Sequence, residues 1–592
     1  MKIIRKYLAI GVIFLFIGTS ITIAKSPLET QKKSVIIVGQ TTWYVDDDNC
    51  PGPGNGSIDN PFCKIQYGID NASYGDTVFV FNGTYNENVV IDKSIKLIGE
   101  GRNITKIDGG GNDDVIQVIE NSVNISGFTI QNSTLSSTYA GIYICSDSCN
   151  VENNNIVSNE NGIFILGAVN LTIEYNNILL NYNHGIYLSY FSDNNNIIGN
   201  NITGNYIQGI CIKESSYNNI YDNVIKENID DGINLCFHAN HNYIINNIIE
   251  KNYDDGIELN DSCENNEILN TSIQNNYNKG IYLYDYSNRN RIFDNYVHHN
   301  YQGIVIQYSN YNKIIGNDLT FNNNTGVRLH FYSNNNEIFN NNFINNTMGG
   351  NPNVYDECNN TWDNSYPSGG NYWDDYNGVD NFSGLNQDEP YSDGIGDTPY
   401  LIPGDGNSDN YPFMEPDGWI NTAPNTPEMP YGEFIGEAGI KYEYNTSTID
   451  FDNDIIWYKW DWGDGSYSDW LGPYISGVKV NSTHSWSVGC YLIRVKAKDI
   501  RGQESNWSEP LEIVMIYKGS LETVFLCGSI TNVRKSIDYS MFNAIKVLWI
   551  GFNPIDIKIL DQNQRIVISN NYFGWPPNLI VIGFYKAIIL QC

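Results

Sequence analysis

A glycine followed by isoleucine or valine recurs through the middle of the chain at intervals of 21 to 24 residues. Three residues after each glycine stands Ile or Leu, so two apolar columns run through every repeat. Alternation with a period of two residues is typical of a half-buried strand. A period near 23 residues indicates a solenoid, in which each repeat buries its apolar face only against its neighbours. The glycines are Gly141, Gly162, Gly185, Gly209, Gly232, Gly256, Gly280, Gly303 and Gly326.

Asparagine follows the same frame as the glycines. It stands four positions before the glycine at Asn181, Asn205, Asn228, Asn252, Asn276 and Asn322, and nine before it at Asn153, Asn176, Asn200, Asn223, Asn247 and Asn317. Ser158 and His299 interrupt the first column, and Thr271 and Asp294 the second. An Asn at the same corner of every coil can hydrogen-bond the next coil, and it tolerates a left-handed backbone. Short strands between such corners, with no room for a helix, predict a parallel β-helix.

The composition excludes some classes of protein. With 592 residues, several domains are expected. The formal net charge is -34, and no cluster of Lys or Arg stands outside the first six residues, so nucleic acid is not an expected partner. Hydrophobic residues make up 41% of the chain and aromatic residues 13%, which argues against intrinsic disorder.

The N-terminus carries an export pattern. Lys2, Arg5 and Lys6 precede an uncharged apolar stretch at residues 7–24. This is the layout of a secretory signal, and its length, near the lower limit for a membrane span, leaves an uncleaved anchor as the alternative. Residues 1–26 are therefore expected to be a signal peptide or an N-terminal anchor, and the protein to be secreted or held at the cell surface.

Eleven cysteines in an exported chain predict some disulfides and at least one unpaired thiol. Cys50 and Cys63 flank a loop rich in Pro and Gly and are expected to pair. Asn-x-Ser/Thr sequons, such as those at Asn71 and Asn82, are candidate glycosylation sites.

The chain from 42 to 416 resembles a known family. The segment 65–130 alternates as the repeats do and is similar to the opening coils of pectin-lyase-like right-handed β-helices. After the last repeat come TWDNSYPSGGNYWDDYNG (361–378), SDGIGDTPY (392–400) and DNYPFMEP (409–416), blocks that resemble those of archaeal surface proteins of the NosD type. These are periplasmic copper-binding β-helix proteins whose repeats overlap the carbohydrate-binding and sugar-hydrolysis (CASH) class. The resemblance implies a right-handed β-helix, export, and either copper handling or polysaccharide contact.

A second resemblance follows the Pro-rich linker NTAPNTPEMP at 421–430. WYKWDWGDGSYSDW (457–470) and THSWSVGCYLIRVKAKDIRGQ (483–503) resemble a PKD domain, which implies an immunoglobulin-like β-sandwich over 431–515. Such modules usually space or display surface proteins. The remainder, 516–592, is expected to be a small β domain of unknown role.

The sharpest candidate site is a repeated Asp-Asp-Gly. Asp230 and Asp231 precede one repeat glycine, and Asp254 and Asp255 precede the next, so equivalent carboxylates are expected to stack one coil apart. Such a pair, with Glu258 on the following strand, suits glycosidase acid/base chemistry, because mutual repulsion raises one pKa. The same carboxylates, with Asp261, suit Ca²⁺ ligation, and they also suit a plain solvated corner. A lyase would need bases, for which Lys279 and His184 stand in the matching column.

Two metal sites are candidates. Copper requires His, Cys or Met gathered in space, and His238 and His241 stand close to Cys236 in one loop. His298 and His299 come two coils later, and they also suit the role of simple substitutes in the Asn column. Asp393 and Asp397, with intervening glycines and Asp388 just before them, resemble a shortened calcium loop, the alternative being an ion-free turn.

Aromatic residues stand on the outward face of the strand that follows the repeat glycine: Tyr143, Phe164, Tyr187, Tyr282 and Tyr284. Rings aligned in a column suit stacking on successive sugars, the alternative being that they cover an otherwise polar sheet. The function expected from the sequence is therefore to bind or organise extracellular or cell-surface carbohydrate without turnover. A polysaccharide lyase or glycosidase, a copper-binding protein and a structural spacer are the alternatives. Calcium or copper are the cofactors to consider, and a glycan is the expected partner.

Overall fold

The computed structural model describes residues 40–346, 350–452 and 454–516, and beyond them the backbone of six strands between Thr523 and Leu590. The expected signal or anchor, residues 1–26, lies outside the described residues. Among the helices that are described, none has the length and apolar character needed to cross a membrane.

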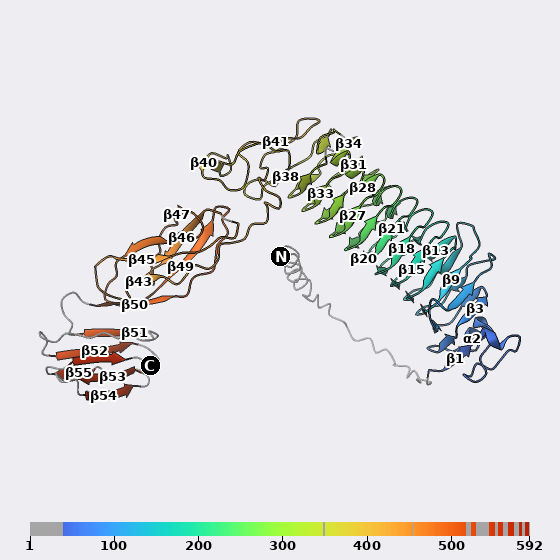
Figure 1. Ribbon diagram of the computed structural model, residues 1–592, viewed down its shortest axis with the longest axis horizontal. Helices are drawn as coiled ribbons and strands as arrows, with labels where there is room; N and C mark the ends of the chain where they lie inside the picture. The colour runs from blue at the N-terminus through green and yellow to red at the C-terminus, as the bar shows by residue number, and fades with distance from the viewer. Residues whose placement is uncertain are drawn as a thin grey trace, which may run out of the picture.

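The predicted all-β architecture with a parallel β-helix is confirmed. Three parallel sheets run the length of the solenoid, and each coil contributes one strand to each (Figure 1). Sheet 1 contains β1 (Thr42–Val45), β2 (Thr77–Val80), β5 (Lys96–Gly99), β8 (Asn124–Ser126), β11 (Asn150–Glu152), β14 (Thr172–Glu174), β17 (Asn196–Ile198), β20 (Asn219–Tyr221), β23 (Tyr243–Ile245), β26 (Glu267–Leu269), β29 (Arg291–Phe293), β32 (Lys313–Ile315) and β35 (Glu337–Phe339).

Sheet 2 follows sheet 1 in each coil. Its strands are β3 (Gly83–Asn86), β6 (Thr105–Asp108), β9 (Thr129–Gln131), β12 (Asn155–Val157), β15 (Asn177–Leu179), β18 (Asn201–Thr203), β21 (Val224–Lys226), β24 (Ile248–Glu250), β27 (Ser272–Gln274), β30 (Tyr296–His298), β33 (Asp318–Thr320), β36 (Asn342–Ile344) and β38 (Tyr372–Trp373).

Sheet 3 carries the two apolar columns that follow the repeat glycine. Ile210 lies beside Ile233 and Ile212 beside Leu235, and all four are fully buried. Its strands are β4 (Val89–Ile91), β7 (Ile116–Val118), β10 (Ala140–Ile144), β13 (Asn161–Leu166), β16 (Ile186–Ser189), β19 (Ile210–Lys213), β22 (Ile233–Cys236), β25 (Ile257–Leu259), β28 (Lys279–Tyr284), β31 (Gln302–Gln307), β34 (Thr325–His330) and β37 (Val354–Asp356).

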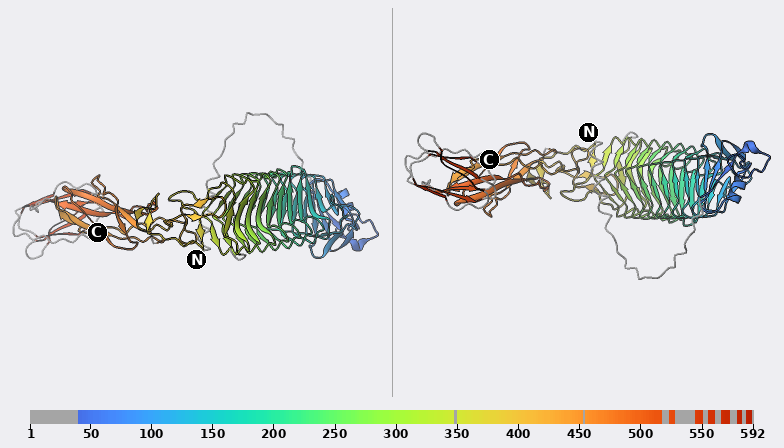
Figure 2. Two further views of the ribbon diagram at one scale, coloured as in Figure 1. Left: turned by 90° about the horizontal axis from the view of Figure 1, so that it is seen from above. Right: turned by 90° about the horizontal axis from the view of Figure 1, so that it is seen from below.

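The coils stack in register along one axis (Figure 2), and the repeat glycine is required by that stacking. A Cβ on Gly232 would lie 2.6 Å from the carbonyl oxygen of Gly256 and 2.6 Å from Cγ2 of Ile249. Atoms do not approach so closely, so the interior leaves room for glycine alone at this position.

Three ladders of buried asparagine run along the corners between the sheets. Asn223 is representative: its Nδ2 donates to the carbonyl oxygens of Ile197 and Tyr221 and to Oδ1 of Asn247, at 2.8 to 3.1 Å. Its Oδ1 accepts the backbone N–H and the Nδ2 of Asn200. Each amide thus accepts the buried corner N–H of the preceding ladder residue, which would otherwise have no partner, and gives nearby carbonyl oxygens a second hydrogen bond.

Ladder 1 lies between sheets 1 and 2, ladder 2 between sheets 2 and 3, and ladder 3 between sheets 3 and 1. Ladder 1 contains Asn154, Asn176, Asn200, Asn223, Asn247, Thr271, Asn295, Asn317, Asn341 and Asn371. Ladder 2 contains Asn159, Asn181, Asn205, Asn228, Asn252, Asn276, Asn300, Asn322, Asn346 and Asn353. Ladder 3, which the sequence frame missed, contains Asn195, Asn218, Asn242, Asn266, Asn290, Asn312, Asn336 and Asn360.

The interruptions expected from the sequence at Ser158, His299 and Asp294 are wrong, and Asn153 is not a ladder member. These four residues have φ between 51° and 57° and stand one place before the ladder amide. The true members there are Asn159, Asn300, Asn295 and Asn154. In the coils of Gly162 and Gly303, the ladder 2 amide stands three residues before the glycine instead of four. Counting four residues back from the glycine therefore reaches the left-handed corner residue and not the amide.

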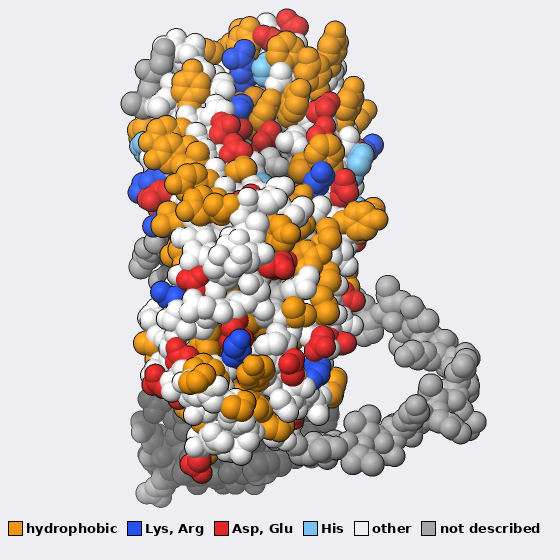
Figure 3. Space-filling view, turned by 90° about the vertical axis from the view of Figure 1, so that its right-hand side faces the viewer, with side chains coloured by type: hydrophobic (Ala, Val, Ile, Leu, Met, Phe, Trp, Pro, Cys, Tyr) orange, Lys and Arg blue, Asp and Glu red, His pale blue; other side chains and the backbone are white. Residues whose placement is uncertain are grey.

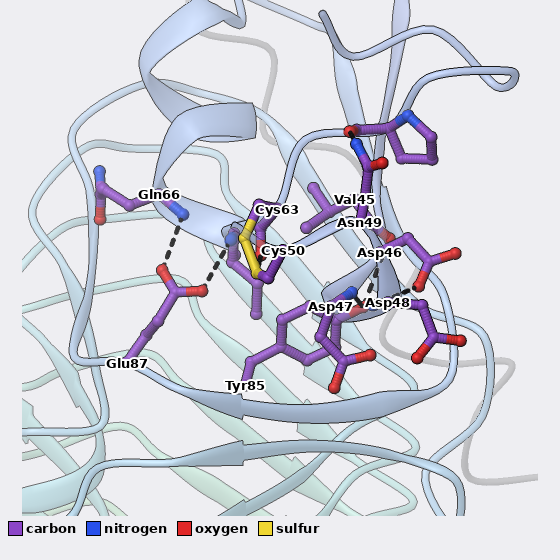
Figure 4. The surroundings of a disulfide bond; sticks show 12 residues. Val45, Asp46, Asp47, Asp48, Asn49, Cys50, Cys63, Gln66, Tyr85 and Glu87 are labelled. Carbon is purple, nitrogen blue, oxygen red and sulfur yellow. Dashed lines mark hydrogen bonds between the residues drawn. A yellow bond between two sulfur atoms is a disulfide. The ribbon is translucent and has the colours of Figure 1, made fainter. Parts of the chain in front are cut away.

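The first coil does not begin as a strand at residue 65. Residues Ile65–Asn71 form α2, whose Ile65 and Ile69 are fully buried over the open end of the core. The carboxylate of Glu87 accepts the N–H groups of Ile65 and Gln66 at the helix N-terminus, where a negative charge is stabilising (Figure 4). The loop before the helix contains η1 (Asp47–Asn49) and is closed by a disulfide between Cys50 and Cys63, the pair expected from the sequence.

The other end of the solenoid is closed by the blocks that resembled the NosD type. Trp373 stacks on Phe343 at 4.4 Å and donates from Nε1 to Oδ2 of the buried Asp409 at 2.9 Å. Trp362 donates in the same way to Asp356. Two hairpins complete this cap: β39 (Phe382–Ser383) with β40 (Glu389–Pro390), and β41 (Tyr400–Leu401) with β42 (Ser408–Asp409).

The segment 431–516 folds as two packed sheets around Trp460, Trp462 and Trp486. One contains β43 (Tyr431–Gly432), β45 (Tyr442–Thr446) and β48 (Val480–His484). The other contains β44 (Ile435–Glu437), β50 (Leu511–Ile516), β49 (Gly489–Asp499), β46 (Ile456–Asp461) and β47 (Leu471–Tyr474). Arg501 of this unit donates to the carbonyl oxygens of Asp393 and Gly418, which joins the sandwich to the cap.

The last strands form two three-stranded sheets. They are β51 (Thr523–Cys527), β52 (Ala544–Ile550) and β55 (Leu579–Ile582) in one, and β53 (Ile555–Leu560), β54 (Ile566–Tyr572) and β56 (Lys586–Leu590) in the other.

The ladders predict a graded effect of substitution. Asn223→Ala leaves the Asn200 N–H buried without an acceptor and removes the Nδ2 donor to the Ile197 and Tyr221 carbonyls, so it is expected to destabilise the solenoid by roughly 2–5 kcal/mol. Asn223→Thr is expected to cost less, because Thr271 fills the same position in a native coil and accepts the N–H of Asn247. Thermal and denaturant unfolding measure both. Asn201→Ala, on the outward face of β18, is the surface control, and equal midpoints for Asn223→Ala and Asn201→Ala would contradict the role of the ladder.

Candidate functional site

The candidate site lies where each coil turns from sheet 2 into sheet 3. After the ladder 2 amide comes a residue that points outward, and in five of six successive coils it is tyrosine. This Tyr row contains Tyr182, Tyr206, Ile229, Tyr253, Tyr277 and Tyr301, which are 47–65% exposed. This row was not predicted from the sequence, although a tyrosine next to a repeating asparagine was the signal available.

The two Asp-Asp pairs follow the Tyr row and stack as expected. Oδ1 of Asp231 accepts the backbone N–H of Asp255 at 3.1 Å, and Oδ1 of Asp255 accepts that of Lys279 at 2.7 Å. Lys279 Nζ also lies 3.2 Å from Oδ2 of Asp255 and 4.0 Å from the centre of the Tyr282 ring. Asp231 and Asp255 are buried, so their first role is to bind the next coil.

The outer members of the pairs accept amide groups from neighbouring coils. Gln208 Nε2 donates to Oδ2 of Asp230 at 2.6 Å, and Asn278 Nδ2 donates to Oδ1 of Asp254 at 2.7 Å. Both carboxyl groups are partly exposed. They form a polar row between the Tyr row and the buried carboxyls.

Two further polar groups lie on the outward face of sheet 3. Asn234 Nδ2 donates to Oδ2 of Asp231 at 3.2 Å and to Oε2 of Glu258 at 2.9 Å. One carboxylate oxygen from each of Asp231, Asp255 and Glu258 lies within 4.8 Å of the others, as does one from each of Asp230, Asp231 and Asp254. The structure therefore brings the predicted carboxyl groups together, Glu258 included, and adds Asn234 to them.

Burial dominates the electrostatics of this cluster. It raises the pKa of Asp231 well above its ordinary value, and the charges of Glu258 and Asp230 act in the same direction. Burial raises the pKa of Asp255 to about 7, although the neighbouring Lys279 opposes the shift. Burial, and then the charge of Asp254, also raises the pKa of Asp230. A carboxyl group that remains protonated at neutral pH can donate a hydrogen bond or a proton.

His184 occupies the position of Asp231 two coils earlier. Its ring lies 4.9 Å from that of Tyr187, and its buried Nδ1 has no hydrogen-bond partner. Burial lowers its pKa to about 4, so the ring is neutral at physiological pH.

The five aromatic residues expected to contact sugar all lie on sheet 3, in two groups. Phe164 and Tyr187 stack at 4.9 Å with an angle of 11° between their planes, and Tyr143 meets Phe164 edge-on at 5.6 Å. Phe164 is buried, and its ring face is covered by Tyr187. Tyr282 and Tyr284 stack at 5.6 Å. Since stacked rings cover each other, this face offers a saccharide ring edges more than ring faces.

The Tyr row offers more accessible rings. Tyr253 and Tyr277 stack at 4.9 Å with nearly parallel planes, and the next member, Tyr301, has no such partner among the ring contacts of the described residues. A pocket of about 570 Å³ opens here, and its volume is in the range of small-ligand sites. It is lined by Glu227, Lys251, Tyr253, Asn275, Asn276, Tyr277, His299, Tyr301 and Asn323. Figure 3, viewed from the side of β28, β31 and β34, shows exposed apolar side chains in strips along the solenoid with carboxylates between them.

The residues expected to hold metals are not gathered in the same way. His238 is exposed, His241 stacks on Tyr217 at 4.9 Å, and neither joins Cys236 in a group of three potential ligands within the described residues. Asp388 is exposed, and it forms no such group with Asp393 and Asp397 in the described cap.

The carboxylates of the candidate calcium loop are used by the turn itself. Asp397 accepts the N–H groups of Asn381 and Phe382, and Oδ1 of Asp393 accepts that of Ile395. Calcium binding at this loop remains a prediction.

Comparison with known proteins gives one family. The family model described as periplasmic copper-binding protein (NosD) matches residues 69–254 and 238–378. Among curated proteins, no sequence matches the chain.

Several solved structures are similar to parts of the chain. The PKD domain of an M14-like peptidase from Thermoplasmatales archaeon SCGC AB-540-F20 is 42% identical and covers 16% of this chain and 98% of its own, with a TM-score of 0.16. The A-module of the Azotobacter vinelandii mannuronan C-5 epimerase AlgE6 is 16% identical and covers 50% and 92%, with a TM-score of 0.41. An alginate lyase from Paenibacillus sp. str. FPU-7 is 16% identical and covers 44% and 95%, with a TM-score of 0.34.

The raised pKa of Asp255 predicts a pH dependence. The folded chain keeps a proton on Asp255 that the unfolded chain releases, so stability is lost as pH rises from about 4 to about 7. Asp255→Asn removes this loss, and its stability relative to the wild type is expected to rise by about 2–3 kcal/mol between pH 5 and pH 8. Unfolding midpoints across this range measure the change. Asp254→Asn makes the same chemical change at the partly exposed neighbour, and a parallel slope for Asp255→Asn and the wild type would contradict the assignment.

Proposed function

The chain belongs to the NosD family, and we propose that it works outside the cytoplasm, where its β-helix binds or organises an extracellular polysaccharide without turning it over. The signal pattern of residues 1–26 and the disulfide between Cys50 and Cys63 support export, since disulfides persist in oxidising surroundings. The family description, a periplasmic protein, agrees with a location beyond the cytoplasmic membrane.

One observation carries the proposal: exposed rings form one row along the solenoid and hydrogen-bonding groups form a second row beside it. Successive members of each row are one coil apart. Within one coil Tyr253 is followed by Asp254, and in the next Tyr277 is followed by Asn278, with the two polar side chains bonded to each other. A sugar presents an apolar ring face and a rim of hydroxyl groups, so it needs an aromatic surface beside donors and acceptors. A saccharide chain along the solenoid would meet similar groups on each coil, because the coils repeat at roughly 4.8 Å.

The charges beside the Tyr row favour a neutral glycan. Asp230, Asp254 and Glu258 border the Tyr row and sheet 3, whereas Lys279 is already paired with Asp255 at 3.2 Å. The whole chain carries a net charge of -34, which repels polyanions at low salt. A neutral polysaccharide meets no such repulsion.

The absence of turnover is proposed from the burial of the carboxyl groups. Asp231 and Asp255 are only 1% and 2% exposed, and each uses an oxygen to bind the backbone of the next coil. A general acid must reach the bond that it protonates. The second candidate function, a lyase or glycosidase, is favoured by the raised pKa values of these two groups and the neutral His184.

Polysaccharide binding is expected to depend on the Tyr row. The double variant Tyr253→Ala/Tyr277→Ala is expected to lose at least tenfold in affinity for a retained polysaccharide, because each ring supplies about 1 kcal/mol or more. Affinity electrophoresis with a panel of neutral and acidic polysaccharides, with and without Ca²⁺, measures retention. Tyr286→Ala/Tyr332→Ala removes two exposed tyrosines elsewhere on the solenoid as the matched control. Failure of the wild type to be retained by any polysaccharide, or unchanged retention of the Tyr253/Tyr277 variant, would overturn the proposal.

The same incubations distinguish binding from catalysis. We expect no new reducing ends and no unsaturated products with the wild type. If products form and Asp231→Asn/Asp255→Asn abolishes them, the protein is an enzyme and the binding proposal is wrong on this point. If products form equally with that variant, turnover occurs but these carboxyl groups do not carry it.

A further inference from the structure

One outward face of the sandwich gathers basic side chains in a chain that is otherwise acidic, with 33 Lys and Arg against 67 Asp and Glu. Alternate residues of β49 from Ile493 to Ala497 are buried in the core, so the residues between them point outward. The neighbouring strand β46 alternates in the same way (Figure 1). We call four outward residues of these two strands the basic face: Lys459, Arg494, Lys496 and Lys498.

Aromatic rings hold these cations in place. Nζ of Lys498 lies 4.7 Å from the centre of the Trp470 ring. Nζ of Lys496 lies 5.4 Å from the same ring and 5.2 Å from that of Trp507. The guanidinium of Arg494 also lies 5.2 Å from the Trp507 ring. A cation over a ring is attracted to it, so these groups are ordered before any ligand arrives, and ordering costs less on binding.

The register of the two strands shows that stability alone does not explain the basic face. Lys459 on β46 lies directly opposite Lys496 on β49, and like charges in this position are destabilising. A sheet surface that served only stability would place a carboxylate opposite each lysine. The repulsion between the two ammonium groups falls when an anion lies between them.

The carboxylates nearby do not neutralise the basic face. Asp461 pairs with Arg494 at 3.0 Å, and Glu504 pairs with Lys496. Within the described residues, no ion pair includes either of the other two cations of the basic face. Two positive charges are therefore left for a partner.

The chemistry of the face selects the kind of partner. Nζ of Lys459 lies 5.9 Å from the ring of Tyr467, which is 55% exposed. A cation beside an exposed ring suits a sugar acid, because the carboxylate needs a positive charge and the sugar ring an apolar surface. A protein partner fits less well, since lysine is depleted from the centre of protein interfaces. Charges more than about 10 Å away are largely screened at 0.1 M salt, so the local positive charge outweighs the net charge of the chain.

We propose that the basic face binds an acidic polysaccharide through its carboxylate or sulfate groups. Lys459 and Lys498 pair with the anionic groups, and Tyr467 contacts a sugar ring. This surface is separate from the Tyr row, to which the proposed function assigns a neutral glycan, and it uses none of the same residues. The chain then holds an acidic glycan on its sandwich and a neutral one on its solenoid.

The test is retention of the full-length protein by polygalacturonate in affinity electrophoresis. The wild type is expected to be retained at low salt and released at high salt. Lys459→Gln/Lys498→Gln is expected to lose at least tenfold in affinity while unfolding at or above the wild-type midpoint, because it removes a like-charge contact. Lys441→Gln/Lys479→Gln is the matched control: it removes two exposed lysines directly before β45 and β48 of the other sheet, and it is expected to be retained as the wild type is.

Further arms identify the ligand. Dextran sulfate is compared with uncharged dextran, and retention by the first alone supports an anionic group as the ligand. Polyglutamate carries carboxylates without sugars, and Tyr467→Ala is expected to weaken retention by polygalacturonate severalfold without affecting polyglutamate. Retention by polyglutamate as strong as by polygalacturonate would mean that the face binds an acidic protein and would overturn the proposal. Unchanged retention of Lys459→Gln/Lys498→Gln, or no retention of the wild type by polygalacturonate or dextran sulfate, would also overturn it.

The Tyr row variant separates this proposal from the proposed function. Tyr253→Ala/Tyr277→Ala is expected to lose retention by a neutral polysaccharide and to keep retention by polygalacturonate, whereas Lys459→Gln/Lys498→Gln is expected to do the reverse. If no neutral polysaccharide retains the wild type, the proposed function fails and the basic face stands. If Tyr253→Ala/Tyr277→Ala loses polygalacturonate, the acidic glycan lies on the solenoid and the basic face is not its site.

Discussion

The solenoid depends on the hydrogen bonds of asparagine side chains at its corners. A parallel β-helix turns sharply three times in each coil, and every turn leaves buried backbone groups that no strand can satisfy. A side-chain amide can bond such groups, because its nitrogen donates and its oxygen accepts. Asn223 donates from Nδ2 to the carbonyl oxygen of Ile197 and accepts the N–H of Asn200 at Oδ1, and both partners belong to the preceding coil. Except at the last member of each ladder, the residue before the ladder amide takes a left-handed conformation, as Tyr175 and Asp222 do, which turns the chain and aims the amide inward. The asparagines of the three ladders are therefore structural.

Once the corners are fixed, equivalent positions of successive coils line up, and the outer surface becomes a set of rows. A row has a uniform chemical character only where successive coils have the same type of residue at that position. Tyrosine after the ladder 2 amide gives an aromatic row. The position directly before the repeat glycine varies along the solenoid, from His184 to Asp231 and Lys279, and this variation produces a local cluster of charged groups. The candidate sites all arise from this variation within a constant frame. The frame explains their spacing, and the individual residues supply the chemistry.

Burial is what separates the candidate sites from an ordinary acidic surface. The carboxyl groups of Asp231 and Asp255 are buried where each coil turns from sheet 2 into sheet 3, and this burial raises both pKa values. Cys211 and Cys236 lie on a face that would be exposed on an isolated sheet, but their neighbours cover them. Groups held in this way present a few fixed atoms, whereas the exposed Tyr row presents a broad surface.

The sequence by itself determined the solenoid, its inward apolar columns and the stacking of Asp231 on Asp255, because each depends on a spacing that repeats with the coil. It also pointed to the pairing of Cys50 with Cys63, since the two flank one short loop. Ladder 3 stayed hidden, because Asn218 and Asn242 stand nine and ten residues after their glycines; their constant spacing of five before ladder 1 was the signal available. Only the tertiary structure decided that Cys211 and Cys236 lie diagonally on adjacent strands, that Asn234 joins the carboxyl cluster, and that His241 stacks on Tyr217. The reason is that contacts across strands depend on register and on the direction of each side chain, and a diagonal pair has no spacing of its own in the sequence.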